Sequence, residues 1–215
     1  MESNYKVRIS KKCRRMQIRI DQAGSVEVVV PNRLAIPSVQ RFVNSKQDWI
    51  QRALEKTRVR KPVYKLAPDG YVRLLGEDKR IVFTLSAQRR FEIYESDLFL
   101  SRRLFPTESE FNLLLKQFAR QYLNERVGFW GKKMGLRVNK VTLRNQRSRW
   151  GSCSRQGNIS LNIKLIHFAS DVIDYVIVHE LCHLQHMNHS KSFWRKVEQY
   201  LPNFRELKKV IRESI

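Results

Sequence analysis

The segment His-Glu-Leu-Cys-His at 179–183 constrains this chain more than any other feature. All five histidines lie within 23 residues that end at His189, so the side chain best suited to zinc at neutral pH is concentrated in one stretch. In a helix, residues i and i+4 lie on one face, so His179 and His183 can direct their imidazoles at one ion. Glu180, the next residue along, can reach a water bound to that ion. The spacing therefore predicts a helical site for one zinc ion per chain, with a position left open for substrate.

The residues around this motif favour a buried helix from Ser170-Asp171 to about Gln185. Its apolar residues are Val172, Ile173, Val176, Ile177, Leu181 and Leu184. Such surroundings exclude water from a site and hold its ligands rigidly. The alternative, in which His179 and His183 are ordinary core or surface histidines, is the weaker interpretation in this context. Cys182, inside the motif, is interpreted as a buried and inert thiol.

The third ligand is less constrained than the first two. His189 follows His183 by six residues, which is the spacing of the extended motif H-E-x-x-H-x-x-G-x-x-H. Here His186 occupies the glycine position of that motif, and Asn188 is expected to supply the left-handed residue that the turn needs. The alternative third ligands are His186, Glu198 and Glu206. His189 is the prediction because it matches the spacing.

Glu180 is predicted to be a general base, with an ordinary surface carboxylate as the alternative. Zinc lowers the pKa of a bound water to about 7, and a carboxylate beside it can take the proton as the water attacks a carbonyl or phosphoryl centre. The motif thus favours hydrolysis as the chemistry of the site.

The charge of the chain is strongly positive. Its formal net charge is +22 and its isoelectric point is about 10.4, which favours polyanionic partners such as nucleic acid, nucleotides, anionic lipid or acidic protein surfaces. From Arg126 through Ser170 there are ten Lys or Arg residues and no Asp or Glu, so positive charge is expected around the site. The alternative is a solvated basic surface that only maintains solubility.

Three widely spaced cysteines, Cys13, Cys153 and Cys182, do not form a disulfide framework, and no C-x-x-C pair is present. The polar N-terminus has no apolar signal core, and no apolar stretch approaches the roughly 20 residues that span a bilayer. These features predict a cytoplasmic protein without a transmembrane segment.

Strand patterns dominate the first half of the chain, and helices dominate the second. Residues 5–30 are expected to form two strands, 38–56 one amphipathic helix, and 63–104 several short strands after a basic linker that ends in Pro62. Thr107 and Glu110 predict a capping box at the start of a long helix, and Gly128, Gly131 and Gly135 mark its end. Two further strands (138–143 and 158–163) and helices at 171–185, 190–201 and 204–215 are also expected.

This order of elements predicts the α+β class. We expect a β-rich N-terminal region at 1–104 with one helix, followed at 105–215 by a zincin-like core of helix, sheet and helix that carries the motif.

Four motifs in the second half resemble the YgjP-like metallopeptidase domain family. They are Arg147–Cys153, Gly157–Asn162, Tyr175–Leu184, and Asn188–Ser190 with Phe193-Trp194. The resemblance is looser in the N-terminal strands and helix but covers most of the chain. It implies a zinc-dependent hydrolase related to WLM and SprT-like proteases, with His179, His183 and His189 as ligands and Glu180 as base.

The Arg-Trp-Gly-Ser segment is a candidate for substrate binding, together with Asn162. Arg149 can hold a carboxylate or phosphate bidentately, and Gly151 allows a close backbone approach. A strand at the cleft edge could pair with an extended peptide. In the structural alternative, Trp150 fills the core and Arg149 bonds backbone carbonyls.

Three functions are consistent with these features. The leading one is a zinc peptidase with a protein or peptide substrate. The second is a metal-dependent phosphohydrolase of nucleotides, although the chain has no P-loop and no carboxylate cluster for Mg²⁺. The third is a basic protein that associates electrostatically with nucleic acid and whose metal site is structural or vestigial, although no DNA-reading motif is present.

Overall fold

The structure is a computed structural model in which two compact units can be described separately, Met1–Pro62 and Val63–Ile215. Together they form an α+β protein, as predicted. The residues that the structure describes are 5–20, 25–31, 36–59, 63–84, 91–101, 107–146 and 148–213.

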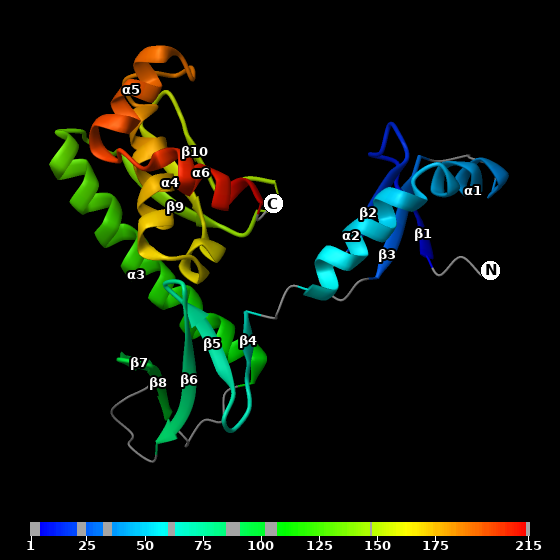
Figure 1. The fold of residues 1–215 in the computed structure, drawn as a ribbon, viewed down its shortest axis with the longest axis horizontal. Coiled ribbons are helices and arrows are strands. Elements are labelled where there is room, and N and C mark those ends of the chain that lie inside the picture. The colour runs from blue at the N-terminus through cyan, green and yellow to red at the C-terminus, as the bar shows by residue number, and fades with distance from the viewer. Residues whose placement is uncertain are drawn as a thin grey trace. The chain divides into compact units, whose positions relative to one another are not determined.

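The first unit contains a three-stranded sheet and two helices (Figure 1). Its strands are β1 (Tyr5–Ile9), β2 (Gln17–Ile20) and β3 (Val26–Val30), in the order β1-β3-β2. The central strand β3 pairs parallel with β1 and antiparallel with β2. Val28 and Val30 of β3 pack against Val39 and Val43 of the helix α1 (Ile36–Asn44), which gives this unit a small core of its own.

Two expectations for this unit were wrong. The stretch 5–20 is not one strand, because a turn closed by a hydrogen bond from the Cys13 N–H to the Ser10 carbonyl separates β1 from β2. The helix expected at 38–56 is also divided, into α1 and α2 (Gln47–Val59). At the break, the Ser45 hydroxyl donates to the Phe42 carbonyl at 2.8 Å, and such local bonds compete with helix continuation.

The second unit begins with a five-stranded sheet on the first half of a long helix, α3 (Glu108–Met134) (Figure 1). The strands are β4 (Tyr64–Lys65), β5 (Tyr71–Leu74), β6 (Glu77–Thr84), β7 (Phe91–Tyr94) and β8 (Asp97–Ser101), in the order β4-β5-β6-β8-β7. The Phe111 ring of α3 meets the Tyr64 ring edge-on with centroids 5.1 Å apart, and Phe118 lies 5.5 Å from Phe91.

The predicted start of α3 is confirmed, whereas the helix continues through two of the three glycines expected to mark its end, Gly128 and Gly131. Thr107 and Glu110 form the capping box, with each side chain accepting from the other's backbone N–H. Gly135 ends the helix at φ 65°, a left-handed conformation that favours glycine. Although α3 is 27 residues long, neither it nor any other helix in the described part of the chain has the length and apolar character needed to cross a membrane.

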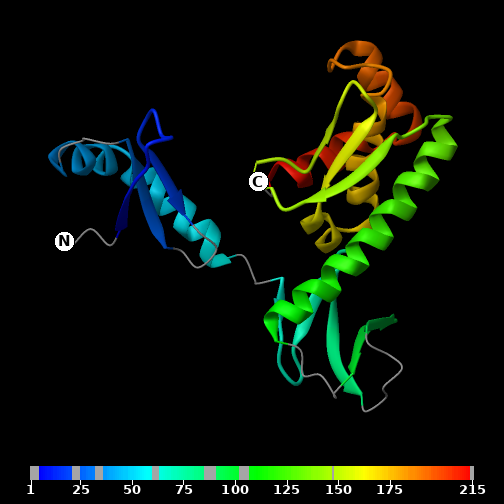
Figure 2. The same ribbon diagram turned by 180° about the vertical axis from the view of Figure 1, so that it is seen from behind.

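The rest of the second unit surrounds one helix, α4 (Ser170–Cys182). A small sheet lies beside it, built from β9 (Lys140–Arg144), β10 (Gly151–Cys153) and β11 (Asn158–Asn162) in the order β10-β11-β9 (Figure 2). The 3-10 helix η1 (Ile163–His167) leads from the sheet to α4, and α5 (Lys191–Tyr200) and α6 (Phe204–Glu213) pack against it. Strand β10 was not predicted, since three residues are too few to show a periodic pattern.

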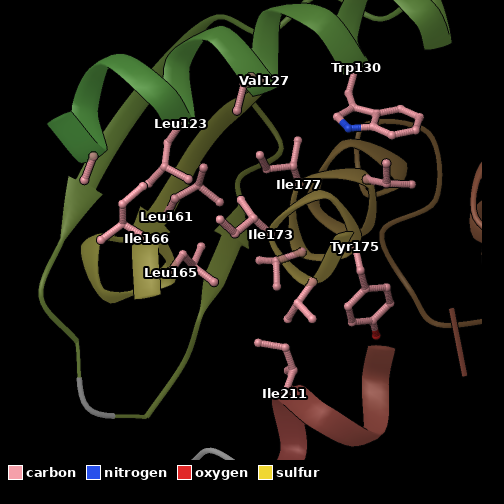
Figure 3. Packing of buried hydrophobic residues seen from close by; sticks show 14 of the residues in the cluster. Leu123, Val127, Trp130, Leu161, Leu165, Ile166, Ile173, Tyr175, Ile177 and Ile211 are labelled. Carbon is pink, nitrogen blue, oxygen red and sulfur yellow. The ribbon is translucent and has the colours of Figure 1, made fainter. Parts of the chain in front are cut away.

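The core of this unit holds α4 rigidly. Leu123 and Val127 of α3 face Ile173 and Ile177 of α4 (Figure 3), and all four side chains are buried. Each such side chain contributes roughly 1.5–3 kcal/mol when it is removed from water. The helix that carries the motif is therefore fixed to α3 by close packing.

The division between the units lies at residue 62, whereas we expected it after residue 104. The reason is that the five-stranded sheet shares its core with α3 and α4. The shared residues from the sheet are Val72, Leu74, Ile81, Leu98 and Leu100. The Leu75 N–H also donates to the Ile166 carbonyl of η1 at 2.8 Å, which ties the sheet to the segment before α4.

Candidate metal centre

The last turn of α4 carries the first part of the candidate site. His179 and Glu180 lie within the helix, and His183 is its C-terminal cap residue, with φ −65° and ψ −18°. The helix thus ends earlier than the predicted Gln185. Because the backbone of His183 keeps right-handed helical angles, its side chain still lies on the same face as that of His179.

The structure brings His179, His183 and His189 together, and their ligand atoms all lie within 4.8 Å of one another. The Nε2 atoms of His179 and His189 are 3.0 Å apart. Two nitrogens bound to one tetrahedral zinc at 2.0–2.1 Å would be about 3.3 Å apart, so this pair needs little adjustment to share an ion.

The other candidates for the third ligand lie outside this cluster, which is the one group of this kind among the described residues. Glu198 forms an ion pair with Arg205 at 3.0 Å. His186 contributes its backbone instead, because its carbonyl oxygen lies 3.0 Å from Nδ1 of His183. Asn188 does not have the positive φ that we expected, so the chain returns to His189 without a left-handed residue there.

The state of these imidazoles suits a cation. A carbonyl oxygen only accepts, so the Nδ1–H of His183 donates to His186 and leaves Nε2 free to bind. Burial, together with the positive charges of His183 and His189, lowers the pKa of His179 to about 3. Burial also lowers the pKa of His189. Both rings are therefore neutral at pH 7, which is the form that coordinates a metal.

Two aromatic residues of α5 form a wall beside the cluster. Ser190 caps this helix by accepting from the Phe193 N–H, so α5 starts directly after His189. The Phe193 ring is fully buried and lies 4.6 Å from the His183 ring, measured between centroids. The Trp194 ring stacks on His189 with centroids 5.5 Å apart and planes 23° apart. These contacts restrict the positions that the imidazoles can take.

Glu180 is buried next to the small sheet. The residue is only 6% exposed, and burial raises the pKa of its carboxyl to about 8, while the positive charge of Arg149 opposes this rise. A Cβ atom placed on Gly151 would lie 2.5 Å from Oε1 of Glu180, which is closer than real contacts allow. The glycine in β10 thus lets the backbone of the strand lie directly against the carboxylate.

The remaining predicted site residues shape the loop before β10. The side-chain amide of Asn162 donates to the carbonyl oxygens of Gln146 at 2.8 Å and Arg149 at 3.0 Å. Trp150 is half-buried and meets the Phe168 ring edge-on at 4.9 Å. The side chain of Arg149 is exposed. Arg147, part of the same motif, lies outside the described residues.

Two neighbours of the cluster were missed by the sequence analysis. Nζ of Lys208 in α6 lies 3.9 Å from the centroid of the Trp194 ring. Tyr175 lies 6.0 Å from the His179 ring, and burial raises the pKa of its hydroxyl to about 12. The position of Tyr175, four residues before His179, could have indicated it, but no spacing rule connects Lys208 with the histidines.

Two histidines and a buried carboxylate at the end of one helix, with a third histidine from the following loop, are the features of a metallohydrolase site. The family model of the YgjP-like metallopeptidase domain matches residues 14–214. The chain therefore belongs to the YgjP-like metallopeptidase family, as its motifs suggested.

Two solved structures are similar to parts of this chain. The metallopeptidase zymogen abylysin of Pyrococcus abyssi is 24% identical, with a TM-score of 0.40, over 43% of this chain and 94% of its own. The metallopeptidase zymogen jannalysin of Methanocaldococcus jannaschii is 20% identical, with a TM-score of 0.39, over 43% of this chain and 97% of its own. No curated protein matches the chain.

Proposed function

We propose that this chain is a zinc-dependent peptidase in which His179, His183 and His189 bind one zinc ion and Glu180 is the general base. The observation that carries the proposal is the convergence of three imidazoles beside a buried carboxylate. Membership of a metallopeptidase family supports a peptide substrate.

The carboxylate is suited to moving protons at neutral pH. With a pKa of about 8, the Glu180 carboxyl group can both accept and return a proton near pH 7. Glu180 would take the proton of the attacking water and deliver it to the leaving amine. Zinc, when bound, would polarise the peptide carbonyl and lower the pKa of a coordinated water to about 7.

Strand β10 offers a place for the substrate. It is an outer strand of its sheet, because the order is β10-β11-β9 and β11 pairs with one of its edges. An extended peptide could pair with the other edge through backbone hydrogen bonds. Gly151 would bring such a peptide close to Glu180, and the exposed Arg149 could bind a carboxylate of the same substrate.

Substitution of Glu180 by Gln tests the proposal. Glu180→Gln removes the base but no ligand, so the variant should keep about one zinc per chain, measured by mass spectrometry, and lose at least 100-fold in the cleavage of a quenched fluorescent casein. Glu198→Gln, on the surface of α5, is the matched control and should cleave at the normal rate. Normal cleavage by Glu180→Gln, or by metal-free protein, would refute the mechanism.

A nucleotide phosphohydrolase is the second candidate, favoured by the positive charges of Arg149 and Lys208 near the site. Both side chains could neutralise phosphate. Release of phosphate from nucleoside triphosphates, measured with the same proteins, separates the two functions. Turnover of nucleotides without any cleavage of casein would replace the peptidase proposal.

A further inference from the structure

We infer that Lys208 is a specificity-determining residue, whose ammonium binds an acidic side chain of the peptide substrate beside the metal centre. The inference rests on the proposed function for the identity of the substrate. It names a residue of α6, an element that the motif does not include.

The position of Lys208 brings its charge to the candidate site. Helix α6 packs against α4, and Nζ of Lys208 lies 3.9 Å from the centroid of the Trp194 ring. The same ring stacks on His189 at 5.5 Å and lies 5.8 Å from the His179 ring. The Trp194 ring therefore contacts both the ammonium and two of the three proposed ligands.

The charge of Lys208 is available to a ligand. Lys208 is half-buried, and within the described part of the chain no carboxylate forms an ion pair with it. By contrast, Arg205 on the same helix is paired with Glu198. An ammonium that is partly removed from water and has no ion-pair partner can take a bound anion as its partner.

The indole ring holds this charge without neutralising it. An ammonium over the face of an indole is attracted by the electrons of the ring, and this attraction orients the side chain. The charge stays close to the cluster, because the Trp194 ring that carries the ammonium also stacks on His189. Since a bound dication would add further positive charge, an incoming anion would be favoured there.

Peptide carboxylates fit this position better than a purely apolar group. The ammonium of Lys208 would bind the carboxylate of an Asp or Glu side chain, while the Trp194 ring, stacked between its neighbours His189 and Phe204, would hold the lysine in place. A phosphate group has the same charge chemistry, so the test must distinguish the two sources.

Binding to a non-cleaving protein gives a readout that does not depend on turnover. Zinc-loaded Glu180→Gln protein is titrated into two fluorescein-labelled decapeptides that differ only by four Asp to Asn changes, and anisotropy is recorded. We expect the Asp peptide to bind about tenfold more tightly. Adding Lys208→Met should remove this preference without weakening the binding of the Asn peptide. Lys208→Arg in its place should keep the preference for the Asp peptide.

Lys209→Met is the matched control, since Lys209 is the exposed neighbour on the same helix. It should leave the preference within twofold of the parent protein. Circular dichroism melting of each variant checks that it is folded. If Lys208→Met does not fold, the affinities of the parent protein and of Lys208→Arg for the Asp and Asn peptides still test the inference.

Equal binding of the two peptides by the parent protein would overturn the inference, as would equal weakening of both by Lys208→Met. Displacement of the Asp peptide by micromolar nucleoside triphosphate, lost in Lys208→Met, would show that phosphate is the anion and overturn the peptide assignment. If the Asp preference depends on Lys208 but the intact chain cleaves no peptide, the proposed function fails while the role of Lys208 stands.

Discussion

Gly151 and Glu180 are in contact although 29 positions separate them in the chain. A methyl group on Gly151 would overlap the Glu180 carboxylate, and the buried surroundings of Glu180 leave it little room to move. We expect Gly151→Ala to lower the rate of casein cleavage at least tenfold and to leave the zinc content unchanged, because no ligand is touched.

Gly128→Ala is the control for this substitution. Gly128 lies inside α3, and a Cβ atom there meets nothing within 4 Å. The exchange should leave cleavage unchanged and raise the free energy of unfolding by up to about 1 kcal/mol, since alanine is the better helix former. If the two alanine variants cleave casein equally well, Gly151 does not position the carboxylate.

The third ligand can be tested by comparing two histidines in the same loop. His189→Ala should weaken zinc binding by at least 100-fold, measured by competition with a chromophoric chelator, because it removes one of three proposed ligands. His186→Ala keeps the backbone carbonyl that accepts from His183, so its zinc affinity should change less than threefold. Equal losses would remove His189 from the proposed site.

At the residue scale, the sequence allowed prediction of what depends on local spacing. The six-residue spacing from His183 to His189 predicted that these side chains meet, although the turn between them lacks the left-handed Asn188 that we expected. The contact of Gly151 with Glu180 and the position of Lys208 depend on how β10 and α6 pack against α4, and no pattern within those segments specifies that packing.

At the element scale, α3 and α4 are joined by a charged pair as well as by apolar packing. Nε of Arg126 donates to Oδ1 of Asp174 at 2.8 Å, and Asp174 is buried. Arg126→Met would leave this carboxylate unpaired, which should lower the free energy of unfolding by about 3 kcal/mol in urea denaturation. Adding Asp174→Leu to Arg126→Met should recover most of the lost free energy of unfolding, because no buried carboxylate is then left unpaired. If the double variant is no more stable than Arg126→Met, the unpaired carboxylate is not the cause of the loss.

Element boundaries were predictable where a capping residue or a linker marks them. The capping box at Thr107 specifies the start of α3 from a few adjacent residues, and Gly135 is the one of three candidate glycines that ends the helix. The break at Ser45 was missed because the apolar stripe runs through it, and the turn after β1 was missed because alternation resumes on the other side. In both places hydrogen bonds of the turn, rather than hydrophobic periodicity, determine where the element ends.

At the scale of the whole molecule, the boundary expected from the change from strands to helices differs from the division that the shared core produces. The basic linker that ends in Pro62 coincides with the division between the two compact units. The expected boundary at 104 separated a β-rich part from a helical part, but strands and helices often share one core. Here β5, β6 and β8 supply part of the core that contains Phe111 and Leu115 of α3.

This shared core predicts how fragments of the chain behave. A fragment of residues 63–215 retains one complete compact unit with all three histidines, so it should unfold cooperatively and bind one zinc per chain. A fragment of residues 105–215 has the same histidines but lacks the sheet that covers Phe111 and Leu115, and those exposed side chains should make it aggregate or bind a hydrophobic dye. Urea denaturation and zinc titration of both fragments check this. If the shorter fragment unfolded cooperatively at the same urea concentration as the longer one, the five-stranded sheet would contribute nothing to the stability of the metal centre. The domain boundary would then lie at residue 104, as first expected.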